Sequence, residues 1–335
     1  MNPLTYVIIN LAIIWLIQTG SVQVNDGTLS QGDVVALYNY MSQILVELIK
    51  LANLIISLTK CVACGNRVQA LFDIKSSQEV TSDKDVIGNA DYAVEFRGVS
   101  LKYKNAGEDS LTGMDFAVKR GETVGIIGGT GSGKSSLVNM IPRFYDATAG
   151  EVLIGGRDVK SFEIPELRER IGIVPQKAVL FKGSIRDNMR WGKDDATDDE
   201  ILAAAKTAQA ADVIESKGGL DFEIEQGGKN LSGGQRQRFT IARALVRKPE
   251  ILILDDSASA LDFATDAALR RSICEMDTNP TVFIVSQRTS SIQHADKIIV
   301  LDDGKIAGIG KHDELLNNCP VYSEIYNSQF KKEAV

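Results

Sequence analysis

A glycine-rich run at residues 128–135, GGTGSGKS, has the most specific chemistry in the sequence. It fits the spacing G-x-x-x-x-G-K-[ST] and lies between a predicted strand and a predicted helix. Glycines let backbone N–H groups turn inward around phosphate oxygens, and a helix start adds the positive end of a dipole. The residues expected to bind phosphate are Gly128, Gly129, Thr130, Gly131, Ser132, Gly133, Lys134, Ser135 and Ser136.

Two of these residues have more specific expected roles. Lys134 is placed to reach the β- and γ-phosphates of ATP and to assist catalysis, and the Ser135 hydroxyl is placed to ligate Mg²⁺. The alternative is a glycine turn that binds nothing. The strand and helix predicted on either side of the run, where the mechanism requires them, argue against that alternative.

A second candidate group is the acidic pair at the end of residues 251–256, ILILDD. A continuous apolar run without alternation is typical of a strand that is covered on both faces. Asp255 at its end is expected to hold Mg²⁺, and Asp256 is expected to act on the attacking water. The alternative interpretation is a pair of charges that only ends the strand.

A second glycine turn lies at residues 230–245, NLSGGQRQRFTIARAL, and precedes a helix expected to start near Gln235. Free backbone amides at a helix start again favour an anion. One nucleotide does not require two phosphate sites within one chain. The sequence therefore suggests that this turn serves a nucleotide held by another chain.

Length and composition fit two domains around these groups. The chain has 335 residues, of which 24% are charged, and its formal charge is −7. These are ordinary globular values, and the negative balance argues against a strong electrostatic hold on nucleic acid. We expect residues 91–335 to form the nucleotide-binding domain, with an antiparallel part near 91–120 and a helical part around 161–240. Residues 76–90 are polar and predict a linker.

The first 75 residues predict a partial membrane domain. Residues 3–24 are uncharged and long enough to cross about 30 Å of hydrocarbon. Residues 32–58 form a second apolar segment with polar residues every three or four positions. This pattern predicts a membrane helix with one polar stripe, and the alternative is a soluble amphipathic helix. Basic residues follow the second segment, so both chain ends are expected in the cytoplasm.

The second glycine turn carries a resemblance to a known family. Residues 231–235, LSGGQ, resemble the signature motif of ATP-binding cassette (ABC) transporters, which implies that Ser232, Gly233, Gly234 and Gln235 contact nucleotide. Further motifs agree in order over residues 90–330. They are Tyr103 (adenine stacking), residues 128–135 (Walker A), Gln176 (Mg²⁺ and the membrane domain), Asp255 (Walker B), Asp262 (D-loop) and residues 281–288 (switch strand).

The resemblance implies an α/β fold of the P-loop NTPase class, with a mostly parallel sheet, an antiparallel β part and a helical subdomain. It also implies ATP hydrolysis coupled to transport, with ATP and Mg²⁺ as cofactors. Residues 1–75 resemble the last two membrane helices, and the descent into the cassette, of bacterial exporter half-transporters.

Three features depart from the family pattern. Asp256 stands where the family places Glu, and Gln287 stands where the family places the switch His. Shortening the acid withdraws its carboxylate by about 1.5 Å, and a misplacement near 1 Å can cost about 100-fold in rate. An amide can contact the γ-phosphate, but it cannot exchange a proton as imidazole does. Half-transporters have six membrane helices, whereas two are predicted here.

These departures predict a hydrolytically weak site in a heterodimer. The expected partners are a second half-transporter, the lipid bilayer and a small amphipathic substrate (a drug, lipid or peptide), with no nucleic acid. The expected location is the cell membrane, as a multi-pass protein with a cytoplasmic cassette. Two alternatives stay open: a truncated or split transporter that needs further segments, and an ABC ATPase with no role in transport.

Overall fold

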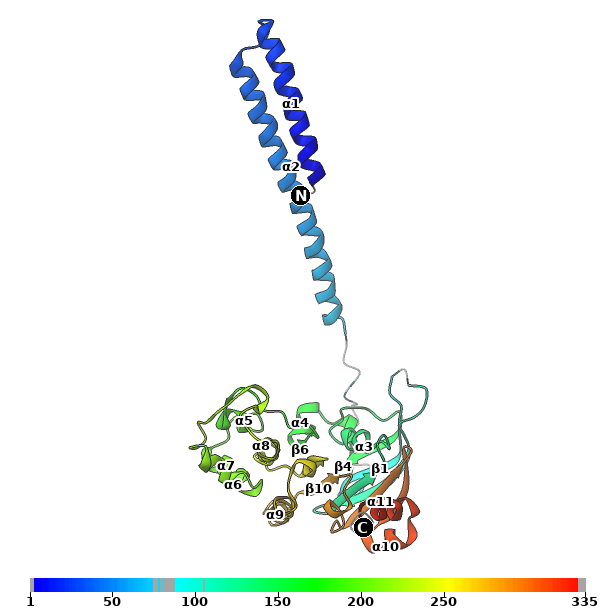
Figure 1. Cartoon of the computed structure of the whole chain (residues 1–335). Helices are drawn as coiled ribbons and strands as arrows, with labels where there is room; N and C mark the ends of the chain where they lie inside the picture. Colours follow the sequence, from blue (N-terminus) through cyan, green and yellow to red (C-terminus); the bar gives the residue numbers. More distant parts are fainter. Residues whose placement is uncertain (1–2, 75–77, 79, 81–87, 105, 331–335) are drawn as a thin grey trace. The chain divides into compact units, whose positions relative to one another are not determined.

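The computed structural model describes residues 3–74, 78, 80, 88–104 and 106–330. The chain divides into two units, residues 1–77 and 78–335 (Figure 1). Most of the predicted linker at residues 76–90 lies outside the described residues, and so do the last five residues of the predicted cassette. Each unit is described separately below.

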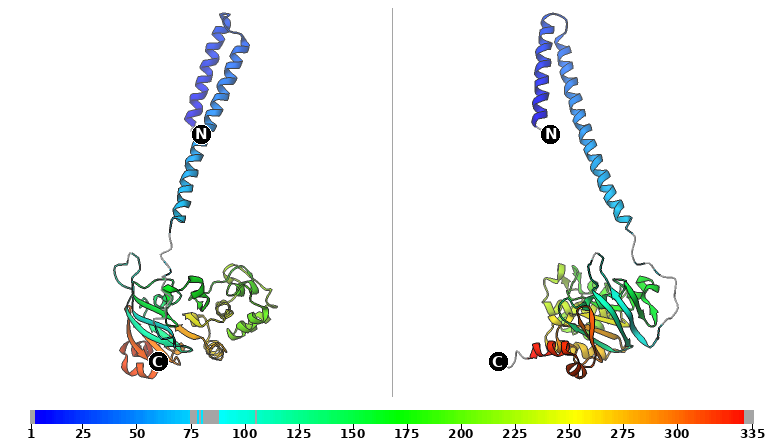
Figure 2. Two further views of the ribbon diagram at one scale, coloured as in Figure 1. Left: turned by 180° about the vertical axis from the view of Figure 1, so that it is seen from behind. Right: turned by 90° about the vertical axis from the view of Figure 1, so that its right-hand side faces the viewer.

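The first unit is a pair of helices, α1 (Pro3–Asn25) and α2 (Gln31–Phe72). Both views in Figure 2 show α1 beside the first part of α2. A capping box starts α2, because the Ser30 hydroxyl accepts from the Asp33 N–H and the Asp33 carboxylate accepts from the Ser30 N–H. Close approach is possible at Gly20, where a Cβ would lie 2.8 Å from a methyl of Val34.

The second helix extends beyond the segment predicted to lie in the membrane. That segment was expected at about residues 32–58, followed by the descent toward the cassette, and α2 continues through this part of the chain to Phe72. Residues 59–72 contain no proline, and their single glycine, Gly65, does not break the helix. Glu47 and Lys50, three residues apart on α2, form an ion pair at 2.7 Å.

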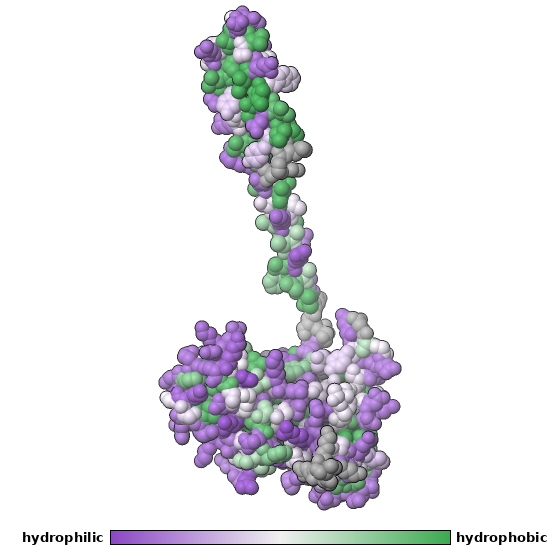
Figure 3. Space-filling view, in the orientation of Figure 1, coloured by the Kyte–Doolittle hydropathy of each residue, from purple (hydrophilic) through white to green (hydrophobic). Residues whose placement is uncertain are grey.

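Hydrophobic residues cover much of this helix pair (Figure 3). Of the helices in the described part of the chain, one stretch, residues 6–25, is long and apolar enough to span a bilayer. A membrane role for α2 stays a prediction.

The second unit begins with an antiparallel sheet. Its strand order is β2-β1-β4-β5, with β1 at Tyr92–Leu101, β2 at Leu111–Lys119, β4 at Ala149–Ile154 and β5 at Arg157–Asp158. The expected antiparallel part near residues 91–120 is therefore present, and it extends to residue 158 through two later strands.

A six-stranded sheet forms the centre of this unit, with the order β12-β11-β3-β10-β9-β6. The five strands from β11 to β6 are parallel to one another, and β12 is antiparallel to β11. Its strands are β3 (Thr123–Gly128), β6 (Ile171–Val174), β9 (Ile251–Asp255), β10 (Thr281–Val285), β11 (Lys297–Asp302) and β12 (Lys305–Gly310). The predicted mostly parallel sheet is confirmed, and its interior strands are buried as parallel strands require.

Helices α5 to α8 gather at one side of this unit, apart from β1 and β4 (Figure 1). The predicted helical part needs correction, because residues 171–174 inside it form β6 of the central sheet. The group itself is α5 (Ile185–Arg190), α6 (Asp198–Thr207), α7 (Ala211–Ser216) and α8 (Gly233–Leu245), with the short strands β7 (Gly183–Ser184) and β8 (Glu223–Ile224).

The remaining helices flank the two sheets. The α-helices are α3 (Lys134–Met140), α4 (Ile164–Glu169), α9 (Phe263–Cys274), α10 (His312–Asn318) and α11 (Pro320–Phe330). Four 3₁₀ turns join the elements: η1 (Val159–Ser161), η2 (Gln226–Gly228), η3 (Ser257–Ala260) and η4 (Thr289–Ser291).

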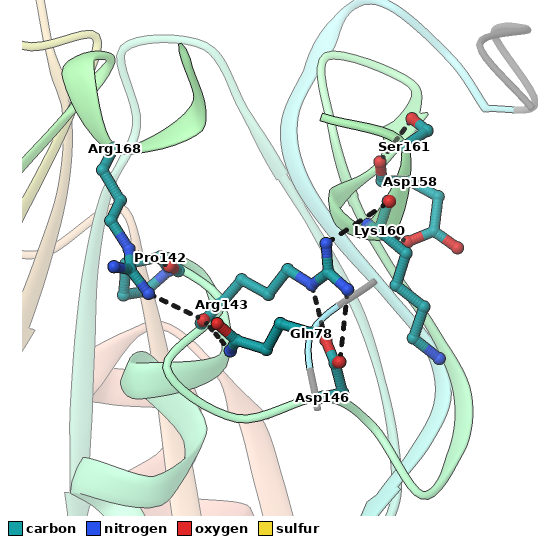
Figure 4. Close-up of polar contacts among 8 residues, drawn as sticks. All are labelled: Gln78, Pro142, Arg143, Asp146, Asp158, Lys160, Ser161 and Arg168. Carbon is teal, nitrogen blue, oxygen red and sulfur yellow. Dashed lines mark hydrogen bonds and ion pairs between the residues drawn. The ribbon is translucent and has the colours of Figure 1, made fainter. Parts of the chain in front are cut away.

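A buried arginine anchors the chain just after α3 (Figure 4). Arg143 is 1% exposed, and its guanidinium donates to the Asp146 carboxylate at 2.7 and 3.2 Å. The carbonyl of Arg143 accepts from Gln78 at 2.6 Å and from Arg168 at 3.1 Å. These bonds hold the end of α3, and therefore help to fix the loop at its start.

Candidate nucleotide-binding site

A cavity of about 590 Å³ opens at the carboxyl ends of β3, β9 and β10. Parallel strands end at one edge of a sheet, which is where α/β folds place their ligands. The structure brings eleven of the predicted site residues to this cavity: Tyr103, Thr130, Gly131, Gly133, Lys134, Ser135, Ser136, Gln176, Asp255, Asp256 and Gln287. These residues come from separate parts of the chain, so the fold assembles the site.

The glycine loop joins β3 to α3, as the sequence predicted. Gly133 precedes the helix with φ 93°, a conformation that L side chains rarely adopt. A Cβ there would lie 2.6 Å from the Leu111 side chain, so glycine is required for packing as well. In the described part of the chain, the start of α3 has no side-chain cap, which leaves its amides for a ligand.

Lys134 folds over the loop that precedes it. Its Nζ donates to the carbonyl oxygens of Gly128 at 2.9 Å and Gly129 at 2.6 Å, and lies 3.4 Å from the Ser132 hydroxyl. The ammonium is half-buried, and burial lowers its pKa against the opposing charges of Asp256 and Asp255. Gly128, Gly129 and Ser132 therefore hold this lysine through their oxygens.

Two oxygen ligands for a hard cation lie together below the loop. The Ser135 hydroxyl on α3 donates to Asp255 Oδ1 at the end of β9 at 3.2 Å, so the two residues expected to hold Mg²⁺ lie side by side. Burial raises the pKa of Asp255; the Ser135 hydrogen bond opposes this rise, and the charge of Asp256 adds to it. A hydroxyl and a carboxylate suit Mg²⁺, which binds through few protein oxygens and keeps others for phosphates and water.

Asp256 follows β9 in a left-handed backbone conformation, with φ 47°. Its N–H donates to the Val285 carbonyl at 2.9 Å, which ties it to the neighbouring strand. Its carboxylate accepts from Gln176 Nε2 at 3.2 Å. Aspartate tolerates this conformation better than most residues, so the local backbone accounts for a short acid here.

Tyr103 belongs to the first motif along the chain and Gln287 to the last, but both line the same cavity. The Tyr103 hydroxyl shares a 2.8 Å hydrogen bond with the Ser136 hydroxyl on α3. Tyr145 packs edge-on against the Tyr103 ring, with 4.9 Å between ring centroids. Gln287 lies two residues after β10, and its carbonyl accepts from Gln329 at 2.7 Å.

Sequence reasoning missed five residues of the cavity wall: Glu108, Asp109, Ser110, Asp303 and Gly304. The first three come from the loop between β1 and β2, and the other two come from the turn between β11 and β12. No motif marks them, and their sequence separation hides the contact. The only local signal is the Asp-Gly pair, which predicts a turn between strands.

The signature residues and Asp262 lie elsewhere. Among the described residues, those that line the cavity do not include Ser232, Gly233, Gly234, Gln235 or Asp262. The helix expected to start near Gln235 starts at Gly233, because Ser232 and Gln235 form a capping box. Asp262 caps α9 by accepting from the N–H and hydroxyl of Thr265.

The second unit combines a strand, a glycine loop and a helix with a second strand of the same sheet that ends in an acidic pair. This combination defines a P-loop nucleotide-binding domain of the ATPase class. The family profile described as "ABC transporter" matches residues 111–259. The chain belongs to the ABC transporter family, and its second unit is the ATP-binding cassette of that family.

Relatives match almost the whole chain. "Uncharacterized ABC transporter ATP-binding protein YfiB" of Bacillus subtilis (strain 168) is 38% identical, over 99% of this chain and 57% of its own length. YgaD of the same strain, named as a candidate multidrug export ATP-binding/permease protein, is 38% identical over 98% of this chain and 57% of its own length.

A solved structure is also similar. It is described as a bacterial Atm1-family ABC exporter with ATP bound, and it is 32% identical with a TM-score of 0.78. The match covers 97% of this chain and 57% of that one. The chain thus spans just over half the length of these proteins.

Proposed function

We propose that the cassette binds ATP with Mg²⁺ in the 590 Å³ cavity. The observation that carries this proposal is the convergence of the glycine loop, Lys134 and Asp255 on one space. Phosphates would replace the carbonyl oxygens that Lys134 now contacts, and the uncapped amides of α3 would face them. The face of the Tyr103 ring would stack on the base.

Magnesium would be held by the Ser135 hydroxyl and the Asp255 carboxylate, with Gln176 nearby. A bound Mg²⁺ supplies neutralisation of the phosphate charge. The chain's own residues would then orient the nucleotide. Lys134 would contact the β- and γ-phosphates, and the loop glycines, which have no side chains, would leave room for the phosphates close to the backbone.

Hydrolysis at this site is proposed to be slow. Asp256 would be the base that acts on the attacking water, but its carboxylate is short and accepts a hydrogen bond from Gln176 at 3.2 Å. Gln287 can contact the γ-phosphate without exchanging a proton. The pocket therefore favours retention of ATP over its rapid consumption.

Ser232, Gly233, Gly234 and Gln235 are proposed to act on a nucleotide held by a second half-transporter. They lie outside this chain's own cavity, at the start of α8. Asp262, at the start of α9, would also face that partner. A partner with Glu after its Walker B aspartate and His in its switch strand would make the faster site.

At the level of the whole protein, we propose an exporter subunit in the cell membrane, with the cassette in the cytoplasm. The apolar stretch at residues 6–25 and the exporter described above support a bilayer location. The name of YgaD supports export of small amphipathic compounds. The two alternatives, a piece of a split transporter and an ATPase outside transport, predict no transport by this chain with one partner.

The direct test is equilibrium binding of Mg·ATP to the full chain in lipid nanodiscs, followed by hydrolysis of the bound ATP. We expect binding with slow turnover, and a rate gain when the partner half-transporter is added. Absence of ATP binding would overturn the proposal. Equal turnover with and without the partner would overturn the heterodimer part alone.

A further inference from the structure

One glutamine near the end of α11 makes three hydrogen bonds to residues 287–291, the segment that follows β10 and is called the switch segment below. Gln329 on α11 donates through Nε2 to the Gln287 carbonyl at 2.7 Å. Its Oε1 accepts from the Thr289 N–H at 2.9 Å and from the Thr289 hydroxyl at 3.0 Å. A single side chain thus bridges the backbone on both sides of residue 288.

The helix that carries Gln329 is itself well anchored. Tyr322 of α11 is fully buried, and its hydroxyl shares a 2.7 Å hydrogen bond with His312 Nδ1 on α10. The His312 ring also packs against Tyr326, with 5.4 Å between ring centroids. This anchoring lets Gln329 hold the switch segment in a fixed place, rather than follow its motion.

The switch segment is held from its other side by α9. The Arg270 guanidinium donates to the Ser291 carbonyl at 3.1 Å, and a 3.0 Å ion pair with Asp266 fixes that guanidinium. The turn η4 at Thr289–Ser291 therefore lies between two polar contacts, one from α9 and one from α11. Gln329 is the one of these two that contacts residue 287 directly.

We propose that Gln329 is a positioning residue, which holds the Gln287 backbone so that the Gln287 side chain meets the γ-phosphate. The inference rests on the proposed nucleotide site. The carbonyl of Gln287 belongs to the peptide plane that follows its own Cα. Fixing this plane limits the directions that the side chain can take. Without the bond from Gln329, the peptide can rotate, and the amide loses its fixed approach to the cavity.

The test compares a nucleotide that has a γ-phosphate with one that lacks it. We would measure binding of Mg·AMP-PNP and Mg·ADP to the full chain in nanodiscs by calorimetry. Gln329→Ala removes all three hydrogen bonds, and Gln329→Glu keeps an acceptor for Thr289 but cannot donate to the Gln287 carbonyl. Asn327→Ala on the same helix is the control, because within the described residues its side chain bonds only to Ser323 one turn earlier.

Both Gln329 variants are expected to weaken AMP-PNP binding about tenfold, as expected for a lost hydrogen bond to a charged group. ADP binding should change less than about twofold. In a Gln287→Ala background, Gln329→Ala should have no further effect on the ratio of the two affinities. Retained ADP binding also shows that each variant is folded.

Three results would overturn the positioning role. They are an unchanged AMP-PNP to ADP ratio in Gln329→Ala, wild-type behaviour of Gln329→Glu, and an equal loss in Asn327→Ala. Failure of the wild-type chain to bind either nucleotide would instead overturn the nucleotide site on which the inference rests.

Discussion

Helices α3 and α8 both begin after glycine-rich turns, but their first turns differ. The start of α3 opens into the 590 Å³ cavity and has no side-chain cap among the described residues. The start of α8 is capped by its own residues, because the Ser232 hydroxyl accepts from Gln235 and the Gln235 amide oxygen accepts from Ser232. At the first start Lys134 adds a positive charge over the glycine loop, and Asp255 lies beside it.

This difference shows why glycine-flanked helix starts cannot be interpreted alike. Backbone amides alone attract anions only weakly, and a strong site needs a fixed cation and a cavity. The α3 site has both within one chain. The start of α8 is a stable, capped helix start outside that cavity, which is why we propose that it acts on a nucleotide held by a partner.

The largest expected effect tests the α3 site. Lys134→Ala removes the ammonium that would contact the phosphates, and should weaken Mg·ATP binding by about 100-fold. The matched control is Lys206→Ala, because Lys206 on α6 is exposed, and this change should leave binding unchanged. Calorimetry on the full chain measures both. Equal binding by Lys134→Ala and wild type would remove the main distinction between α3 and α8.

A gain of function tests why the α3 site retains its nucleotide. The joint change Asp256→Glu and Gln287→His should raise single-turnover hydrolysis of bound ATP by at least about tenfold, since a better-placed base and a titratable switch residue recover lost transition-state contacts. Either single change should raise the rate less than the double change, because it recovers only one of the two contacts. The left-handed backbone at residue 256, with φ 47°, also tolerates glutamate less well than aspartate. An unchanged rate in the double variant would show that other residues make the site slow.

A pair of glycine variants separates the two helix starts most cleanly. In this chain an added Cβ at Gly129 or at Gly233 meets nothing within 4 Å, so alanine fits at both positions. Gly129→Ala should weaken ATP binding by this chain about tenfold, because the methyl would crowd a phosphate. Gly233→Ala should leave that binding intact and lower ATP turnover only when the partner is present.

The outcome of the Gly233→Ala variant is easy to interpret, because alanine favours a helix over glycine by about 1 kcal/mol. A loss of partner-dependent turnover would therefore not come from a destabilised α8. If Gly233→Ala instead weakened ATP binding by the chain alone, the two helix starts would share one nucleotide, and the comparison would fail.

The smallest effect concerns the base. Tyr103→Ala should lower Mg·ATP affinity about fivefold, since stacking of a base on an aromatic ring is worth about 1 kcal/mol or more. Tyr103→Phe keeps the ring and loses only the hydrogen bond to Ser136, so the change should be less than about twofold. Equal losses in both variants would assign the role of Tyr103 to its hydroxyl rather than to its ring.

The elements around the start of α3 could be predicted from the sequence because they are local. The glycine loop, its strand and its helix are continuous, and Asp255 is marked by the buried run before it. The parts it missed depend on contacts between distant segments. Asp303 and Gly304 reach the cavity from a turn after β11, and Gln329 contacts residue 287 from a helix 42 positions later in the chain.

One helix start differs from the prediction for a local physical reason. The start of α8 was predicted near Gln235, but the helix begins at Gly233, because the reciprocal bonds of Ser232 and Gln235 draw both glycines into the first turn. Side-chain capping, rather than hydrophobic pattern, sets this helix start.

The most direct test follows the fate of ATP after the full chain, alone in nanodiscs, has bound it with Mg²⁺. We predict that the nucleotide stays bound as ATP, with turnover well below about 1 per second, the lower end of the usual range for enzymes. Conversion of the bound ATP to ADP at or above that rate by the chain alone would contradict the account.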